Sequence, residues 1–300
     1  MISSVIVLFN PDLNHLNFLI NSLDDQVDHI VLVDNTPLNL KKYRCNEFDD
    51  FKKVHYIDLM DNLGIAKAHN EGIKKSKDLN SEYVIIFDQD SSVERDFIEK
   101  LYTVNLKIRR ENKNVCAVGP SYVDIKTNRT ASVIRFRGFK VQRISPNPNE
   151  HYTKADYIIS SGTLIKIKDL DKIGPMLEEL FIDYVDLEWG LRAKKMGYDC
   201  YIANNVIMKH AIGDSSLKVP FSKKFVNIHS DFRKYFIIRN AFYLIFYSDL
   251  QINWRIVQIP KTIMYFIYIF LFVSPKINII KIFFKALKDA LFKNMGRGSI

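Results

Sequence analysis

Asp88 and Asp90 flank Gln89 at the end of the apolar run 83–87 of this 300-residue chain. If that run is a strand, residues two apart point to the same side, so the two carboxylates leave the strand end together. Carboxylate oxygens are preferred ligands of Mg²⁺ and similar cations, whose remaining positions substrate phosphates can fill. The pair therefore predicts a divalent-cation site, and the alternative is a helix N-cap made by Asp90 or Ser91.

A second acidic cluster holds Asp183, Asp186 and Glu188 at the start of a helix predicted over 185–196. Carboxylates in a first helical turn are stabilised by the helix dipole, which is the structural explanation for them. Three acids exceed what a helix start requires, and a carboxylate that removes a proton from an acceptor hydroxyl would use the same residues. His210 ends another predicted strand, and its type leaves both a structural and a metal-binding role open.

These residues need a sheet to bring them together, and the first half of the chain predicts one. Short β-branched runs alternate with helical patterns, which is typical of a parallel α/β sheet. Strands are expected over 5–9, 29–33, 54–59, 83–87 and 115–118, with helices over 13–23, 65–77 and 97–110. Polar residues follow the first four strands, namely Asn10, Asp34 with Asn35, Asp61 with Asn62, and Asp88 to Asp90. Ligands of open α/β sheets bind beyond these carboxyl ends, so one shared crevice is predicted.

The second half of the chain is predicted to be less regular. The stretch 121–152 is polar and carries Pro146 and Pro148, so we expect an irregular insertion or a hairpin. Further strands are predicted over 157–159, over 164–167, around Tyr201 and over 206–208. No GxGxxG or GxxxxGK[ST] motif stands in the right place, which argues against a dinucleotide-binding or P-loop enzyme.

Positive charge is concentrated at the C-terminal end. The chain carries 43 Lys and Arg against 34 Asp and Glu, yet residues 218–300 alone hold 14 basic and 3 acidic residues. The first 217 residues carry 29 basic and 31 acidic residues, which argues against a nucleic-acid groove across the whole protein. The basic end is instead predicted to meet an anionic surface.

This basic region combines an apolar run with a lysine-bordered helix. The run 263–273 has eleven residues, fewer than the roughly 20 that a spanning helix needs, and extending it to 256 includes Pro260 and Lys261. Lysines at 276, 281, 285, 288 and 293 border the apolar face that follows, which favours a helix lying in a membrane interface. We therefore expect residues 255–295 to bind an anionic membrane peripherally, the alternatives being a core-facing helix and a dimer contact.

Cysteine usage and the first residues bear on the compartment. Cys45, Cys116 and Cys200 are widely spaced without a CxxC motif, so neither a zinc ribbon nor a disulfide framework is predicted. A reducing compartment is the simplest expectation. The first apolar run ends at Asn10 after about six residues, which is too short for the core of a signal peptide.

Six short motifs follow one another along the chain. They are Asp34-Asn35, Asn62-Leu-Gly64-Ile-Ala66-Lys-Ala-His-Asn70-Glu-Gly72, Asp88-Gln89-Asp90, Ser160-Ser161-Gly162-Thr163-Leu164, Asp183-Tyr-Val-Asp186-Leu-Glu188-Trp189-Gly-Leu-Arg192 and His210-Ala-Ile-Gly213-Asp214. In this order they resemble glycosyltransferase family 2, and the residues within the motifs resemble most its bacterial rhamnosyltransferase branch. The resemblance covers about residues 4–245 and includes Arg239-Asn240.

The resemblance implies a GT-A fold, which is a Rossmann-like, mostly parallel α/β sheet with flanking helices. It also implies a nucleotide-diphosphate sugar donor, Mg²⁺ or Mn²⁺, and an inverting displacement. Asp186 is then the catalytic base with Glu188 as the second acid. Asp183 becomes the rival base if the alignment with the family motif is shifted by three residues. The resemblance implies donor binding by Asn10, Asp34, Asn35, Asn62, Gly64, Ala66, Asn70, Asp88 and Gln89, metal binding by Asp88, Asp90 and His210, and acceptor binding by Ser161, Gly162 and Trp189.

The predicted organisation is a catalytic domain over 1–217, with a nucleotide-sugar half to about 120 and an acceptor half beyond, followed by a basic, aromatic helical region over 218–300. The predicted activity is transfer of L-rhamnose from dTDP-L-rhamnose to a saccharide acceptor, expected to be lipid-linked, in synthesis of a bacterial cell-surface polysaccharide. Its expected place is the cytoplasmic face of the inner membrane, with a homo-oligomer possible. The alternatives are a UDP-sugar-dependent galactofuranosyl or hexosyl transferase, and a non-catalytic membrane module that binds nucleotide or lipid.

Overall fold

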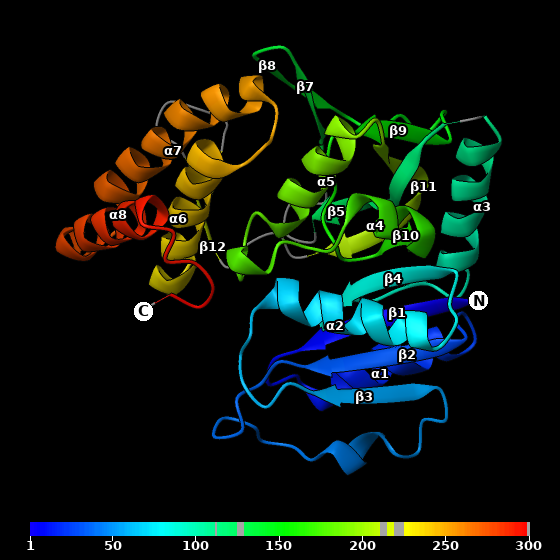
Figure 1. Ribbon diagram of the computed structural model, residues 1–300. Helices are drawn as coiled ribbons and strands as arrows, with labels where there is room; N and C mark the ends of the chain where they lie inside the picture. The colour runs from blue at the N-terminus through cyan, green and yellow to red at the C-terminus, as the bar shows by residue number, and fades with distance from the viewer. Residues whose placement is uncertain (112, 125–128, 211–214, 219–224, 299–300) are drawn as a thin grey trace.

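A computed structural model describes residues 1–298 apart from 112, 125–128, 211–214 and 219–224. Its main sheet runs in the order β3-β2-β1-β4-β10-β5-β11-β9, with β6 added beside β5. Figure 1 shows this sheet with helices on its faces and the C-terminal helices grouped at one side. The mostly parallel α/β sheet expected from the sequence is confirmed.

The N-terminal half consists of parallel strands joined by helices. β1 (Ile2–Leu8), β2 (His29–Asp34), β3 (Val54–Asp58) and β4 (Tyr83–Asp88) pair in parallel, and the helices between and after them are α1 (Leu13–Asp24), α2 (Ile65–Asp78) and α3 (Phe97–Arg110). Almost every side chain of β1, β2 and β4 is buried, as expected for strands covered on both faces. Asp12 caps α1 by accepting from the Asn14 amide at 2.9 Å.

The second half of the main sheet continues it with mixed strand directions. β10 (Thr163–Lys166) runs antiparallel between β4 and β5 (Val115–Asp124), whereas β11 (Asp199–His210) is parallel to β5. β9 (Tyr152–Ala155) closes the edge beside β11. Helices α4 (Ile167–Ile173) and α5 (Val185–Lys195) lie in this half. Short 3-10 helices occupy Glu178–Leu180 here and Cys45–Phe48 between β2 and β3.

Several predicted elements differ from the observed ones. The strand expected over 157–159 is wrong, since the chain is irregular there and the strand is β9, a few residues earlier. The two strands predicted around Tyr201 and over 206–208 form one strand, β11, with a register shift between Ala203 and Ile207. The predicted insertion contains a hairpin, β7 (Val133–Arg137) with β8 (Lys140–Ile144), and the two residues of β6 (Arg129–Thr130).

Cysteine spacing along the chain also proved a poor guide to distance. Cys116 and Cys200 lie on the neighbouring strands β5 and β11, both buried, with their sulfur atoms 3.2 Å apart. Both are free thiols.

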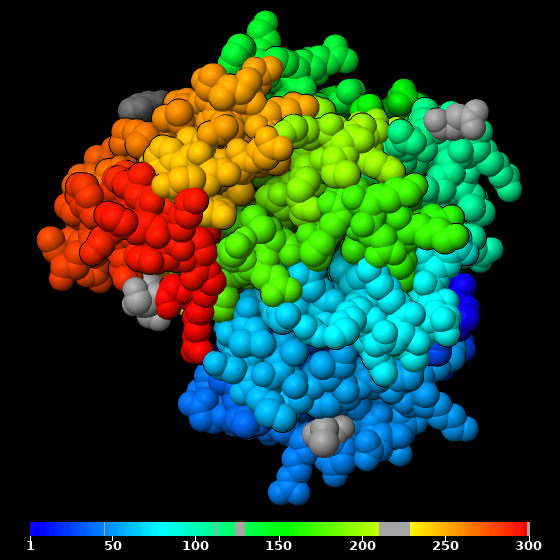
Figure 2. All heavy atoms as spheres, in the orientation of Figure 1, coloured from blue at the N-terminus to red at the C-terminus, as the bar shows by residue number. Residues whose placement is uncertain are grey.

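The C-terminal region forms a second hydrophobic core. It contains the pair β12 (Ser215–Lys218) and β13 (Phe225–Ile228), then α6 (Asp231–Tyr247), α7 (Ile252–Phe272) and α8 (Lys276–Leu291). Phe236, Phe242 and Phe283 pack in this core together with Phe181, which lies just before α5. Figure 2 shows these helices, in yellow, orange and red, closely packed against the green part of the chain.

Helix α7 corrects the prediction of a short apolar run. It continues through Pro260 for 21 residues, and within the described part of the chain it is the one helix long and apolar enough to cross a membrane. This test uses length and composition alone, so by itself it is weak evidence for a span.

Candidate active site

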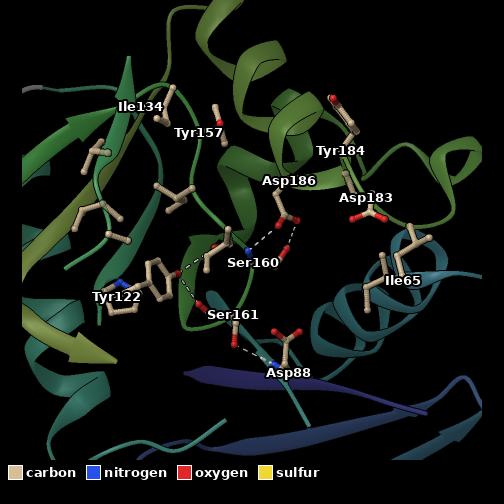
Figure 3. Close-up of a pocket in the computed structure, with 18 of the residues that line it drawn as sticks. Ile65, Asp88, Tyr122, Ile134, Tyr157, Ser160, Ser161, Asp183, Tyr184 and Asp186 are labelled. Atoms are coloured by element: carbon tan, nitrogen blue, oxygen red, sulfur yellow. Dashed lines mark hydrogen bonds between the residues drawn. The ribbon is translucent and has the colours of Figure 1, made fainter. Parts of the chain in front are cut away.

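A cavity of about 780 Å³ lies between the carboxyl end of β4, the segment 157–161 and the start of α5. Asp88, Asp90, Asp183 and Asp186 all line it, although they come from segments almost a hundred residues apart. Figure 3 shows Asp88 above the sheet and Asp183 and Asp186 across the cavity from it. The structure therefore brings together the carboxylates from both acidic clusters.

Asp186 is held at the cavity wall by Ser160. The Ser160 amide donates to Oδ2 of Asp186 at 3.0 Å, and the Ser160 hydroxyl donates to Oδ1. Burial raises the pKa of Asp186 to about 6, an effect that the two bonds from Ser160 oppose and the negative charges of Asp88 and Asp183 reinforce. A carboxyl group with such a pKa is ionised at neutral pH and basic enough to accept a proton there.

Asp183 has a different environment because the guanidinium group of Arg233 pairs with it. Arg233 of α6 donates to both carboxylate oxygens of Asp183, at 2.6 and 3.3 Å. Glu188, two residues beyond Asp186 on α5, faces away from the cavity and pairs with Arg192 at 2.8 and 3.0 Å. Of the three predicted acids, Asp186 is the one that lines the cavity and forms no ion pair with a described residue, since Arg233 pairs with Asp183 and Arg192 with Glu188. The prediction of Glu188 as a catalytic residue is therefore not supported.

The backbone around Asp183 has an uncommon conformation. Phe181, Asp183 and Tyr184 all have φ between 62 and 67°, a region that costs non-glycine residues about 1–3 kcal/mol each and persists only where neighbours enforce it. Asn240 of α6 provides that enforcement, since its amide nitrogen lies within 2.8–3.0 Å of the carbonyl oxygens of Leu180, Ile182 and Asp183.

Arg239, next to Asn240, fixes the preceding turn. Its side chain is fully buried, and it donates to the carbonyl oxygens of Glu179 and Leu180 at 3.2 Å each and of Gly296 at 2.7 Å. We call Arg239 and Asn240 the α6 clamp. The sequence indicates this pair only through the family resemblance, because nothing in its local pattern predicts contacts with a loop some sixty residues earlier.

The end of β4 is joined to the Ser160–Ser161 turn. The Asp88 amide donates to the Ser161 hydroxyl at 3.2 Å, and that hydroxyl lies 2.9 Å from the hydroxyl of Ser91. Tyr122 donates to the Ser161 carbonyl oxygen at 2.6 Å. Ser161 thus links the turn that holds Asp186 to the strand that carries Asp88.

Asp88 and Asp90 fit a divalent cation by the chemistry of their oxygen ligands. Within the described residues no group of three His, Cys, Asp or Glu side chains is arranged to hold a metal, so donor phosphates would complete the coordination. The third predicted ligand, His210, has its backbone in β11, but its side chain lies outside the described part of the structure.

The predicted nucleoside residues lie at the carboxyl ends of β1, β2 and β3. Asp34 is fully buried and accepts from Tyr56 and from Lys41, whose Nζ is 2.8 Å away. These donors hold the pKa of Asp34 below its usual range although burial opposes them. Oδ1 of Asn10 is buried without a protein partner among the described residues, which leaves an acceptor for a ligand N–H group.

Asn35 and Asn62 organise the next loop. Asn35 donates to Asn62 at 2.9 Å and accepts from the Leu63 amide at 2.7 Å, while Asn62 accepts from the Gly64 amide. Gly64 has a φ of +90°, and a Cβ there would lie 2.7 Å from Phe181, so glycine is required for this close approach. Ala66 is buried behind the loop.

Four other predicted binding residues serve mainly to hold the fold. Both amide atoms of Asn70 bond to Met176, and its nitrogen also bonds to Glu178. Gln89 pairs with the Phe9 backbone. Trp189 is 3% exposed and donates to the Gly174 carbonyl oxygen, and a Cβ on Gly162 would meet Met208 at 2.7 Å. Direct ligand binding by Asn70, Gln89, Trp189 and Gly162 is therefore not supported, because other protein groups occupy these side chains or positions.

His69 is a cavity residue that sequence analysis missed. It lines the main cavity, is 2% exposed, and neither ring nitrogen has a partner among the described residues. Burial lowers its pKa to about 4, so the ring is neutral at physiological pH. An unpaired buried imidazole is costly, which marks His69 as a candidate to contact a bound ligand.

Comparison with known proteins agrees with this architecture. Residues 3–174 match the family model "Glycosyl transferase family 2". The chain is 39% identical over 247 residues to the dTDP-rhamnosyl transferase RfbF of Shigella flexneri, covering 81% of this chain and 79% of that protein. It is 23% identical to the hexosyltransferase Agl10 of low-salt glycan biosynthesis in Haloferax volcanii, covering 77% and 76% of the two chains.

Solved structures show the same fold. Residues 1–349 of S. aureus TarS in complex with UDP-GlcNAc give a TM-score of 0.57 at 14% identity, over 97% of this chain and 80% of that chain. GalNAc-T7 with UDP, GalNAc and Mn²⁺ gives 0.57 at 14% identity, over 70% of this chain and 44% of that chain. The GT-A-like fold is thus confirmed, and from the family model and the identity to RfbF the chain belongs to glycosyltransferase family 2.

Proposed function

We propose that this glycosyltransferase moves L-rhamnose from dTDP-L-rhamnose to a saccharide acceptor, with inversion at the anomeric carbon. The observation that carries the donor assignment is the 39% identity to a dTDP-rhamnosyl transferase over four fifths of the chain. The shared cavity of Asp88, Asp90 and Asp186 supports the reaction type.

In this proposal Asp186 is the catalytic base. It accepts the proton of the attacking acceptor hydroxyl, whose oxygen forms a bond to the anomeric carbon while the bond to the donor diphosphate breaks. General-base catalysis of this kind contributes about 10²- to 10⁴-fold to the rate. Ser160 keeps the Asp186 carboxylate oriented, and the ion pair with Arg233 removes Asp183 from competition for the proton.

Asp88 and Asp90 are the proposed holders of Mg²⁺ or Mn²⁺. When bound, the cation supplies positive charge that stabilises the leaving diphosphate. Asp34 and Asn10 are the proposed contacts of the nucleoside, at the ends of β2 and β1. We place His69 beside the donor on account of its unpaired ring.

We also propose that the C-terminal helices rest on the cytoplasmic face of a bacterial membrane. The buried face of α7 includes the polar Gln258 and Thr262, whereas Ile256, Met264 and Leu271 are 46–69% exposed. This is the reverse of a helix in a water-soluble protein, so the exposed face suits lipid. Lysines of α8 would add attraction to anionic headgroups.

A donor panel tests the proposed activity. The purified full-length chain is incubated with dTDP-rhamnose, UDP-galactofuranose, UDP-glucose or UDP-N-acetylglucosamine, with Mg²⁺ or with chelator, and released nucleoside diphosphate is measured. We expect release from dTDP-rhamnose in the presence of metal. Preference for a UDP-sugar would favour the hexosyl or galactofuranosyl alternative, for which the similarity to Agl10 is the supporting observation. No release from any donor would contradict a transferase role.

A further inference from the structure

We infer that a second cavity beside Asp186 is the acceptor site, and that Lys261 there recognises the diphosphate of a lipid-linked saccharide. This inference rests on the proposed transferase function. The second cavity has a volume of about 340 Å³ and lies between the β7 strand, the segment 157–159 and helix α7. Phe136, Tyr157, Trp254, Gln258 and Lys261 are among its lining residues.

The position of this cavity relative to the main one is the first argument. Tyr157, Asp183, Tyr184 and Asp186 line both cavities, and Figure 3 shows them together at one end of the main cavity. The Asp88–Asp90 pair lines only the main cavity. A single displacement needs the acceptor hydroxyl to approach opposite the leaving group, with the base beside it. Asp186 therefore lies where a donor chamber and an acceptor chamber meet.

The lining chemistry is the second argument. The partly exposed aromatic side chains of Phe136 and Tyr157 offer apolar faces of the kind on which sugar rings pack, and the buried Trp254 completes the cavity wall. Gln258 donates to the Tyr184 hydroxyl at 2.6 Å, which fixes a polar pair in the wall. Lys261 is exposed, its Nζ lies 5.3 Å from the centre of the Phe136 ring, and no carboxylate pairs with it among the described residues. Its charge is thus available to an anionic group.

Helix α7 supplies the third argument, because it has two faces with different surroundings. Trp254 and Gln258 are buried and face the acceptor cavity, whereas Ile256 and Ile259 are 45–46% exposed on the outer face. A helix whose outer face contacts lipid would place Lys261 and the cavity next to the membrane surface. An acceptor anchored by a lipid chain would present its diphosphate there.

The binding of geranyl diphosphate tests this site without knowledge of the acceptor saccharide. Binding is measured by calorimetry on the full-length chain, with saturating dTDP and Mg²⁺ so that the donor site is filled, and geraniol serves as the probe without phosphate. We expect geranyl diphosphate to bind at least tenfold more tightly than geraniol. Lys261→Met should abolish this tenfold preference, whereas Lys261→Arg should retain it.

Lys172→Met, an exposed lysine on α4, is the matched control and should retain the preference. Equal binding of the two probes by the wild-type chain would overturn the inference, and so would an unchanged preference in Lys261→Met. Failure of the proposed function is a separate result, since it would appear as a wild-type chain that releases no diphosphate from any nucleotide sugar.

Discussion

Asp186 differs from the other cavity carboxylates in its partners, which gives a prediction at the scale of one residue. Asp186→Asn removes the proton acceptor but keeps the size of the side chain. We expect transfer to fall by at least 10²-fold, because that is the lower range of general-base catalysis. The melting-temperature shift caused by dTDP and Mg²⁺ should persist, since Asp88 and Asp90 are intact. Transfer rates and thermal shifts, measured side by side, check both parts.

The matched comparison for this variant is Asp183→Asn. Asp183 is paired with Arg233, so its loss would act through the loop geometry and not through the proton transfer itself. Near-normal turnover by Asp186→Asn together with a larger loss in Asp183→Asn would assign the base to Asp183 instead.

The pH dependence of the reaction follows from the pKa of Asp186, which burial raises to about 6. The base must be ionised to act, so kcat/KM for the acceptor should rise with pH through about 6 and then level off. Stability changes in the opposite direction. The pKa of Asp186 in the folded chain lies above the ordinary 3.8, so the folded chain keeps this proton to a higher pH than the unfolded chain does. The free energy of unfolding therefore falls as the pH rises from about 3.8 to about 6.

Ser160→Ala tests the cause of that pKa. Hydrogen bonds from Ser160 favour the ionised form of Asp186, so loss of the hydroxyl should raise its pKa further. The rise in the pH–rate profile should move to higher pH, and the loss of activity should be larger at pH 6 than at pH 8. A uniform loss at both pH values would mean that Ser160 acts by another route.

Residue types at strand ends were predictable, but their partners were not. Parallel strands place their carboxyl ends at one edge, which is why Asp34 and Asp88 could be expected in one crevice from the strand pattern, whereas the donor-binding role of Asp34 came from the family resemblance. The family resemblance assigned Glu188 as the second acid beside Asp186, yet two residues on a helix that are two apart differ by about 200° and point to opposite sides. The distant contact of Arg233 with Asp183 leaves no local signal in the sequence.

At the scale of elements, the loop 179–184 depends on α6 for its conformation. Asn240→Ala would leave three carbonyl oxygens without their shared donor, next to three residues at positive φ. We expect a loss of about 1–3 kcal/mol in the free energy of unfolding, the usual cost of such unsatisfied buried groups. Turnover should fall at least tenfold, with a smaller change in the donor KM, because the loop leads directly into the start of α5, where Asp186 lies.

Asn149→Ala, in an exposed turn, is the control for that variant and should leave both stability and turnover unchanged within twofold. If Asn240→Ala lost stability but kept its turnover, the α6 clamp would have no part in positioning the catalytic loop.

The periodicity of the sequence was a good guide to elements with uniform surroundings and a poor one elsewhere. The buried strands β1, β2 and β4 lie where their β-branched runs predicted. Helix α7 continues past Pro260, although proline removes one backbone donor, because the helix is packed against α6 and α8. Such packing overrides a local break signal, and it cannot be read from the residues around the proline.

At the scale of the whole molecule, we propose the boundary near 217 as a change of role and not as a division between independent units. The α6 clamp holds the loop 179–184, and Arg297 pairs with Asp61, which follows β3 in the N-terminal half, at 3.0 Å. Phe181 belongs to the same hydrophobic core as the C-terminal helices. The C-terminal region therefore supports the active site as well as the proposed membrane surface.

The lysines of α8 provide the test of membrane binding. Lys276, Lys281 and Lys288 are exposed, and each lysine near an anionic bilayer contributes about 1 kcal/mol of attraction. Replacing all three by Gln should therefore weaken binding to phosphatidylglycerol-containing vesicles by roughly 100-fold, with a much smaller effect on neutral phosphatidylcholine vesicles. Sedimentation of the protein with each vesicle type measures both.

The control replaces Lys42, Lys52 and Lys172, which are also exposed but lie in the first 217 residues. This change removes the same charge and should leave vesicle binding within about twofold, since these lysines lie away from the proposed contact surface. Equal losses in the two triple variants would show that net charge, and not the surface of α7 and α8, directs the protein to the membrane.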